Sequence, residues 1–111
     1  MAKRLSKALR GKRRWIGVQL SSKIRSRNQL KTIIQGISSH LQLSSEPKLI
    51  DFDLDVIPNG CGTGILQVKL SDYPQFREHI SSNDSLDKIG IFSLTSSGKI
   101  RLVRERLSNL Q

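Results

Sequence analysis

The sequence predicts an α+β fold with the element order β-α-β-β-α-β, preceded by a basic arm and followed by a further helix. Three observations support this prediction. Three short stretches alternate apolar and polar residues with the period of two that is typical of half-buried strands, and a fourth is apolar on both sides. Apolar residues elsewhere recur at intervals of three and four, the spacing of amphipathic helices. The chain of 111 residues has the length of one domain.

A basic arm, residues 1–13, is expected to precede a single domain over residues 14–111. The domain begins with a predicted strand over residues 14–20. The side chains expected to face the core from this strand are Ile16, Val18 and Leu20, and those on its other side are Trp15, Gly17 and Gln19.

The first helix is predicted to follow Ser26, because Ser26 and Gln29 have the spacing of a capping box. The apolar residues on its predicted buried face are Leu30, Ile33, Ile34, Ile37 and Leu41. A polar connection over residues 42–47 then leads to the second strand.

The second strand is predicted over residues 49–56, where apolar and acidic residues alternate. We expect Ile50, Phe52, Leu54 and Val56 to face the core and Asp51, Asp53 and Asp55 to face away from it. A glycine-rich turn separates this strand from a third, over residues 65–70, whose inward side chains are Leu66, Val68 and Leu70.

A short helix is predicted after Asp72, which can cap it, with Pro74 in the first turn. Residues 81–85 are expected to form a loop. Residues 88–95 are predicted as a fourth strand that is central or covered, because it is apolar on both sides.

The last helix can be capped by Ser96 or Ser97, and its apolar stripe comprises Ile100, Val103, Leu107 and Leu110. The complete order is that of the split β-α-β pattern. The sequence therefore predicts a ferredoxin-like, RRM-like sandwich with a basic N-terminal arm and an extra C-terminal helix.

The charge of the chain is strongly segregated. Residues 1–31 carry eleven basic and no acidic side chains, residues 46–87 have a net charge of −5, and residues 88–111 one of +4, within a total of +10. We expect the basic segments to bind a polyanion. The arm has too few bulky apolar residues for a membrane-surface helix, so nucleic acid is the favoured partner.

An RRM usually stacks bases on aromatic side chains of its central strands. Here that face is predicted to show Trp15 beside a row of aspartates, which would repel phosphate. We therefore expect a protein partner on this face, at Trp15, Asp51, Asp53, Asp55 and Ile65. A solvated strand face and a Mg²⁺ site are the alternative interpretations of the aspartates.

RNA is expected to bind the arm and the last helix instead. The residues predicted to contact it are Lys3, Arg4, Lys7, Arg10, Lys12, Arg13, Arg14, Lys99, Arg101 and Arg104. The start of the last helix, Ser97-Gly98-Lys99, can bind phosphate through its backbone N–H groups or serve as a simple helix cap.

No pattern of catalytic or metal-ligating residues is recognisable. His40, His79 and Cys61 are isolated in the sequence, and the glycines between residues 60 and 64 lack a Walker lysine. The chain alone is therefore not expected to be a catalyst or to bind a metal or cofactor. A single cysteine, and no apolar run long enough to cross a membrane, predict a cytoplasmic protein.

Three segments resemble the small protein subunit of archaeal ribonuclease P, protein component 2, which has a eukaryotic counterpart. They are Lys12-Arg13-Arg14-Trp15-Ile16, Gly64-Ile65-Leu66 and Ser97-Gly98-Lys99-Ile100-Arg101, and the similarity runs in order from Lys12 to Leu107. Trp15 stands where this family usually has tyrosine, and Lys99 stands where it commonly has threonine.

The resemblance implies an RRM-like subunit that binds the catalytic domain of ribonuclease P RNA. It also implies pairing with a larger, TIM-barrel-like protein subunit and a capacity for self-association. The holoenzyme would remove 5′ leaders from precursor tRNA, with the RNA and its Mg²⁺ performing the chemistry.

Two other functions fit a small basic α/β domain. A ribosomal protein would co-sediment with ribosomes. An acylphosphatase-like enzyme would need an arginine in a phosphate-binding loop after the first strand, a role for which Arg25 or Arg27 is available. No glycine-rich loop surrounds them, which disfavours the enzyme.

Overall fold

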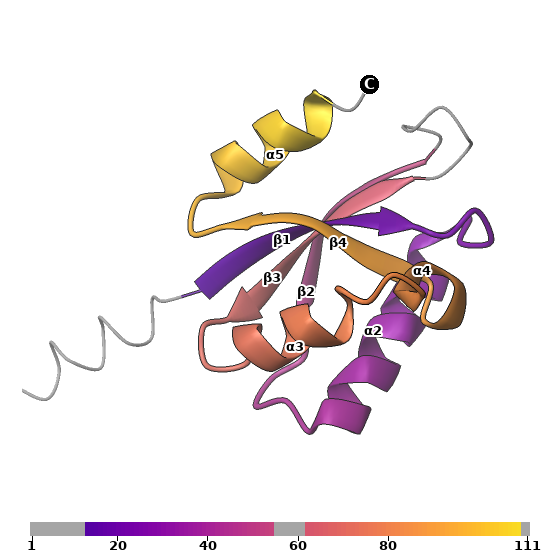
Figure 1. Ribbon diagram of the computed structural model, residues 1–111, viewed down its shortest axis with the longest axis vertical. Coiled ribbons are helices and arrows are strands. Elements are labelled where there is room, and N and C mark those ends of the chain that lie inside the picture. The colour runs from indigo at the N-terminus through magenta and orange to yellow at the C-terminus, as the bar shows by residue number, and fades with distance from the viewer. Residues whose placement is uncertain (1–12, 55–61, 110–111) are drawn as a thin grey trace, which may run out of the picture.

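The computed structural model describes residues 13–54 and 62–109, which form an antiparallel sheet with helices on both faces (Figure 1). The strands are β1 (Arg13–Leu20), β2 (Lys48–Asp53), β3 (Thr63–Lys69) and β4 (Ile91–Ser97). The helices are α2 (Arg27–Leu41), α3 (Tyr73–His79), α4 (Ser85–Lys88) and α5 (Ile100–Ser108). The predicted α+β class is confirmed.

The four strands lie in the order β2-β3-β1-β4, and all neighbours are antiparallel. β3 therefore separates β1 from β2, the two strands that α2 connects, as in a split β-α-β unit. This arrangement is consistent with a ferredoxin-like fold. Helices α2 and α3 cover one face of the sheet, and α5 covers the opposite face (Figure 1).

The predicted capping box of α2 is confirmed. The Ser26 hydroxyl accepts a hydrogen bond from the Gln29 backbone N–H at 3.3 Å, and the Gln29 side chain accepts one from the Ser26 N–H at 3.1 Å. These bonds satisfy N–H groups that have no partner inside the helix. They fix the start of α2 so that its apolar face meets the sheet.

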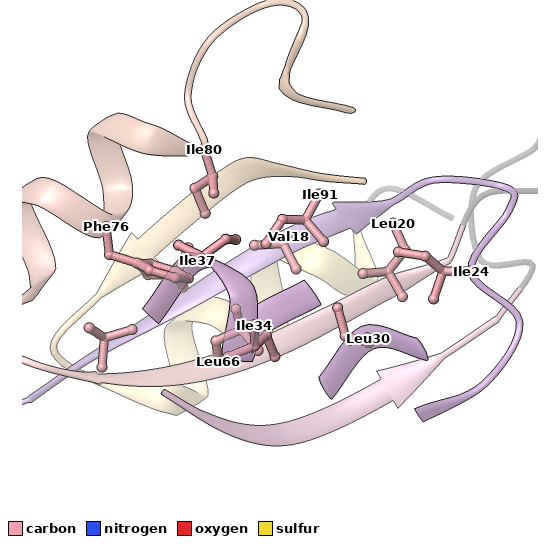
Figure 2. Close-up of a cluster of buried hydrophobic side chains, with 12 residues drawn as sticks. Val18, Leu20, Ile24, Leu30, Ile34, Ile37, Leu66, Phe76, Ile80 and Ile91 are labelled. Atoms are coloured by element: carbon pink, nitrogen blue, oxygen red, sulfur yellow. The ribbon is translucent and has the colours of Figure 1, made fainter. Parts of the chain in front are cut away.

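The main core lies between the sheet and the helices α2 and α3 (Figure 2). Its buried residues are Ile16, Val18, Leu20, Ile24, Leu30, Ile34, Ile37, Leu66, Val68, Phe76, Ile80 and Ile91. The predicted inward sides of β1 and α2 are therefore largely confirmed. Burial of this apolar surface is the principal source of stability for the fold.

A smaller cluster lies between the sheet and α5. Ile65, Val103 and Leu107 are buried in it, and the hydrophobic residues packed against them are Trp15, Ile50, Leu94 and Ile100. Gly17 allows α5 to approach the sheet, because a Cβ there would lie 3.0 Å from methyl groups of both Leu107 and Val103. This close approach makes α5 an integral part of the fold.

The predicted alternation of β2 is wrong at Ile50. The pairing of β2 with β3 shifts register between Leu49 and Asp51, which is the mark of a β-bulge. Leu49 consequently packs against the main core, while Ile50 packs in the cluster beneath α5. The extra residue turns Ile50 to the side that Asp51 also occupies.

In the second half of the chain, the bounds of the helices and strands differ from the predicted ones. Residues 85–88 form the unpredicted helix α4, and the fourth strand is Ile91–Ser97 rather than 88–95. β4 is an edge strand of the sheet, but side chains cover it on both faces, because Ile91 and Leu94 belong to the two different clusters. Leu70 lies beyond β3 and is exposed rather than inward.

Asp72 does not cap α3 through its side chain. It is buried and accepts hydrogen bonds from Ser44 and Ser45, including one of 2.8 Å from the Ser44 hydroxyl. The carboxylate therefore joins the start of α3 to the α2–β2 connection, a contact between positions far apart in the sequence.

Candidate nucleic-acid interface

Exposed basic side chains gather where β1 begins and β4 ends. The strand register places Trp15 opposite Ser97 and Arg13 opposite Lys69. Facing residues of antiparallel strands lie about 5 Å apart at their Cα atoms and point to the same side. The first basic residues of the domain thus lie beside the β4–α5 turn and the end of β3. We call this region the basic end of the sheet, and its cations are Arg13, Arg14, Lys69 and Lys99.

Arg14 occupies the other side of β1 at this basic end. Its guanidinium lies 5.9 Å from the centre of the Tyr73 ring, a cation–π arrangement. The Tyr73 hydroxyl is 2.6 Å from the Ser96 hydroxyl, which joins α3 to β4. A Cβ at Gly98 would collide with the Arg14 guanidinium, so this glycine leaves the space that the side chain occupies.

The β4–α5 turn differs from the sequence prediction, because neither Ser96 nor Ser97 is the N-cap. Both residues belong to β4, and Lys99 is the cap residue without a side-chain cap bond. The Ser97 hydroxyl instead accepts a hydrogen bond of 3.1 Å from the Lys99 N–H. No side chain therefore caps the start of α5, and the Lys99 side chain is exposed.

Arg106 supports the same turn from within α5. Its guanidinium donates hydrogen bonds to the Thr95 hydroxyl at 3.0 Å and to the Ser96 carbonyl at 3.1 Å. The sequence alone did not predict a place at this end for Arg106, Lys69 or Tyr73. Lys69 is brought there by strand register, and Arg106 and Tyr73 by helix packing, neither of which follows from sequence spacing.

Several basic-end cations have no carboxylate partner in the part of the chain that the structure describes. Within residues 13–54 and 62–109, ion pairs join Lys88 to Asp84 and Arg104 to Asp51. Arg13, Arg14, Lys69 and Lys99 form none with a described residue. Their charge is available to a polyanion at this end of the molecule.

Acidic side chains occupy the opposite end of the α5 face, where β2 ends and β3 begins, and we call Asp51 and Asp53 the acidic end of the sheet. The register places Asp51 opposite Ile65 and Asp53 opposite Thr63. Asp53 lies about 20 Å along the strands from Arg13, because six residues of an antiparallel strand span roughly that length. One face of one sheet therefore changes from positive to negative along its strands.

Arg104 was predicted to bind RNA, but it pairs with Asp51. Its Nε donates to an Asp51 carboxylate oxygen at 2.9 Å and its second nitrogen reaches the other oxygen at 3.4 Å. The hydrogen bond that Arg104 donates to Asp51, together with the carboxylate charge, raises the pKa of Arg104 above its usual value. This two-point contact links α5 to β2 on the surface of the domain.

A cavity of about 190 Å³ lies beneath the C-terminal part of α5, and Asp51, Asp53, Thr63, Arg104 and Ser108 are among its lining residues. The predicted protein-interface residue Ile65 also lines it but is only 1% exposed. Trp15 is half-buried and packs in the same cluster. α5 thus covers the centre of the predicted interface and leaves the aspartates at its margin.

Several predicted site residues lie outside the described part of the chain. They are Lys3, Arg4, Lys7, Arg10, Lys12 and Asp55, and Cys61 lies outside it as well. The arm that contains five of these cations is joined to the domain at Arg13 and therefore leads directly into the basic end.

Candidate metal ligands and one candidate arginine can be placed within residues 13–54 and 62–109. There, no group of three or more histidine, cysteine, aspartate or glutamate side chains could hold a metal ion. Arg27, one candidate for an acylphosphatase role, has its guanidinium 6.0 Å from the centre of the Phe52 ring. No helix of the described chain is long and apolar enough to cross a membrane.

Comparisons with protein-family models, with curated proteins and with solved structures find no match for this chain.

Proposed function

We propose that this protein is a non-catalytic, RNA-binding subunit of ribonuclease P that acts in the cytoplasm. One observation supports the proposal above all others. The antiparallel register brings the start of β1 and the β4–α5 turn together, so cations separated by more than eighty positions converge on one end of the sheet. The arm, with five further bases among residues 1–12, is joined to the same end.

The resemblance to the archaeal ribonuclease P subunit is consistent with this arrangement. The first two of its segments form neighbouring strands, with Ile16 opposite Leu66, and the third begins at the end of β4, where Ser97 faces Trp15. The first and third segments therefore meet at the basic end, and the second pairs with the first further along β1.

The proposed mechanism is charge neutralisation. A folded catalytic RNA brings phosphates close together, and cations at their junctions offset the repulsion and release condensed counterions. In this proposal Arg13, Arg14, Lys69 and Lys99 contact phosphate, with the arm extending the contact. The RNA, with its Mg²⁺, cleaves precursor tRNA, and the protein lowers the Mg²⁺ concentration that the active RNA fold requires.

The acidic end is the proposed contact for the larger barrel-like subunit. Asp51 and Asp53 lie at the margin of α5 and complement a basic protein surface. Ile65 is excluded from this contact in the present conformation, since α5 covers it. The RNA and the partner protein would then occupy opposite ends of one sheet face.

The first test measures RNA binding as a function of salt concentration. Six phosphate contacts would give a slope of log K against log[salt] of about −4 to −5, and the double substitution Arg13→Gln/Arg14→Gln should make it shallower by about 1.5. The matched control is Lys23→Gln/Lys31→Gln, which removes two charges from exposed positions outside the basic end. Equal effects of the two double variants would contradict a localised interface.

The second test measures precursor-tRNA cleavage by the catalytic RNA across a Mg²⁺ titration, with and without the chain and its barrel-like partner. The proposal predicts a lower Mg²⁺ midpoint with the native proteins and a smaller reduction with the Arg13/Arg14 double variant. An unchanged midpoint with native proteins would refute assignment to ribonuclease P, while salt-dependent RNA binding would still support a general RNA-binding protein.

A further inference from the structure

The two histidines of the chain, distant in the sequence, lie next to one another in the structure. His40 is in the last turn of α2, and His79 is the final residue of α3. Their ring centres are 5.5 Å apart, and the rings are tilted by 40°. They come from the two helices that cover the same face of the sheet (Figure 1).

This separation suits two imidazoles bound to one ion. A zinc–nitrogen bond of about 2.1 Å, added to about 1.1 Å from nitrogen to ring centre, places each centre about 3.2 Å from the metal. Two such rings at a tetrahedral angle would have centres about 5.2 Å apart. The observed distance differs from that value by only a few tenths of an ångström.

The surroundings of the two rings are also compatible with a bound metal ion. Partial burial, and secondly the positive charge that His40 can carry, lower the pKa of His79 below its usual value. Neutral imidazole is the form that has a lone pair for a metal. His40 additionally lies near the C-terminal carbonyl groups of α2, whose partial negative charge favours a cation.

No competing partner is found for either ring among the described residues. Neither histidine forms a hydrogen bond or ion pair with another described side chain, and the ring–ring contact is the interaction they share. The charged neighbours of His79 on α3 are Arg77 and Glu78, which point to other sides of the helix because positions one and two apart do not share a face.

We propose that His40 and His79 form a binding site for a divalent transition-metal ion that prefers imidazole, such as Zn²⁺, Ni²⁺ or Cu²⁺. Water completes the coordination. The ion bridges α2 and α3 and thereby stabilises α3, a helix of seven residues of which Phe76 alone is buried. This site is independent of the proposed RNA interface.

The test is calorimetric titration of the metal-free protein with Zn²⁺, alongside unfolding measured with and without the ion. We expect one equivalent to bind, and either His40→Gln or His79→Gln to weaken binding at least tenfold. At a Zn²⁺ concentration one hundred times the dissociation constant, the unfolding equilibrium constant of the native chain should fall about a hundredfold. Neither single variant should show this stabilisation at the same concentration.

Two controls make the result specific. Cys61→Ser should bind Zn²⁺ as tightly as the native chain, which excludes the single thiol as a ligand. Mg²⁺, which prefers oxygen ligands, should produce no stabilisation. Failure to bind Zn²⁺ at millimolar concentration, or loss of binding in only one of the two histidine variants, would overturn the bridging site.

Discussion

The two faces of the sheet differ in what they bury and in what surrounds the buried part. The α2–α3 face carries the main core, whose twelve buried side chains come from strands, helices and the β1–α2 connection. The α5 face buries three residues beneath one helix, and its strand ends carry opposite charges. The first face stabilises the domain, while the second combines modest burial with two strand ends of opposite charge.

The largest expected effect is on the main core. Phe76→Ala should reduce the free energy of unfolding by about 3–5 kcal/mol, because Phe76 is fully buried and its truncation leaves a cavity. Urea denaturation measures the change. The exposed Leu70→Ala is the control and should change stability by less than about 0.5 kcal/mol. A loss of less than about 1 kcal/mol for Phe76→Ala would mean that the α2–α3 face does not carry the main core.

The next effect concerns how closely α5 packs. Gly17→Ala should destabilise the protein by about 1–2 kcal/mol, because the added methyl would press on Leu107, Val103 and Thr95 at 3.0–3.1 Å. Gly36→Ala is the matched control. Gly36 has open space around its Cβ position in the middle of α2, so that substitution should stabilise by about 0.5–1 kcal/mol. Urea denaturation measures both changes, and a loss of stability in Gly17→Ala with a gain in Gly36→Ala would support the close approach of α5 to the sheet.

A smaller effect is expected from the ion pair that links α5 to β2. Asp51→Asn should lower the urea midpoint slightly at low ionic strength, and the loss should shrink in 1 M salt, because exposed ion pairs are screened. Asp53→Asn is the control, since Asp53 lies on the same side of β2 and forms no ion pair with a described residue. Indistinguishable midpoints would mean that the α5 face is held by apolar contacts alone.

The smallest effect is on the pH dependence of stability. Asp84, before α4, has its carboxyl pKa lowered from 3.8 to about 2, chiefly by the hydrogen bond with Lys88. Because the folded-state pKa lies below the unfolded one, the contribution is present above pH 3.8 and is lost as the pH falls towards 2. In Asp84→Asn the free energy of unfolding, measured by urea denaturation, should depend less on pH between these values. Asp87→Asn should keep the pH dependence of the native chain. A steeper dependence in Asp84→Asn would contradict the assignment.

Elements that depend on interactions between neighbouring residues could be predicted from the sequence. The capping box at Ser26 and Gln29 and the apolar spacing of α2 are properties of neighbouring residues, and both were predicted correctly. The inward side of β1 follows from simple alternation. The segregation of charge is likewise visible in the sequence, because it needs no knowledge of which residues meet.

The contacts between these elements could not be predicted from the sequence. The bulge that turns Ile50 under α5 and the burial of Ile65 depend on strand pairing and on where the last helix packs, which residue spacing does not specify. The contacts of Arg104 with Asp51, and of Arg14 with Tyr73, join positions more than fifty residues apart. The physical reason is that helix periodicity and capping act within a few residues, whereas register and packing are fixed by the free energy of the whole fold.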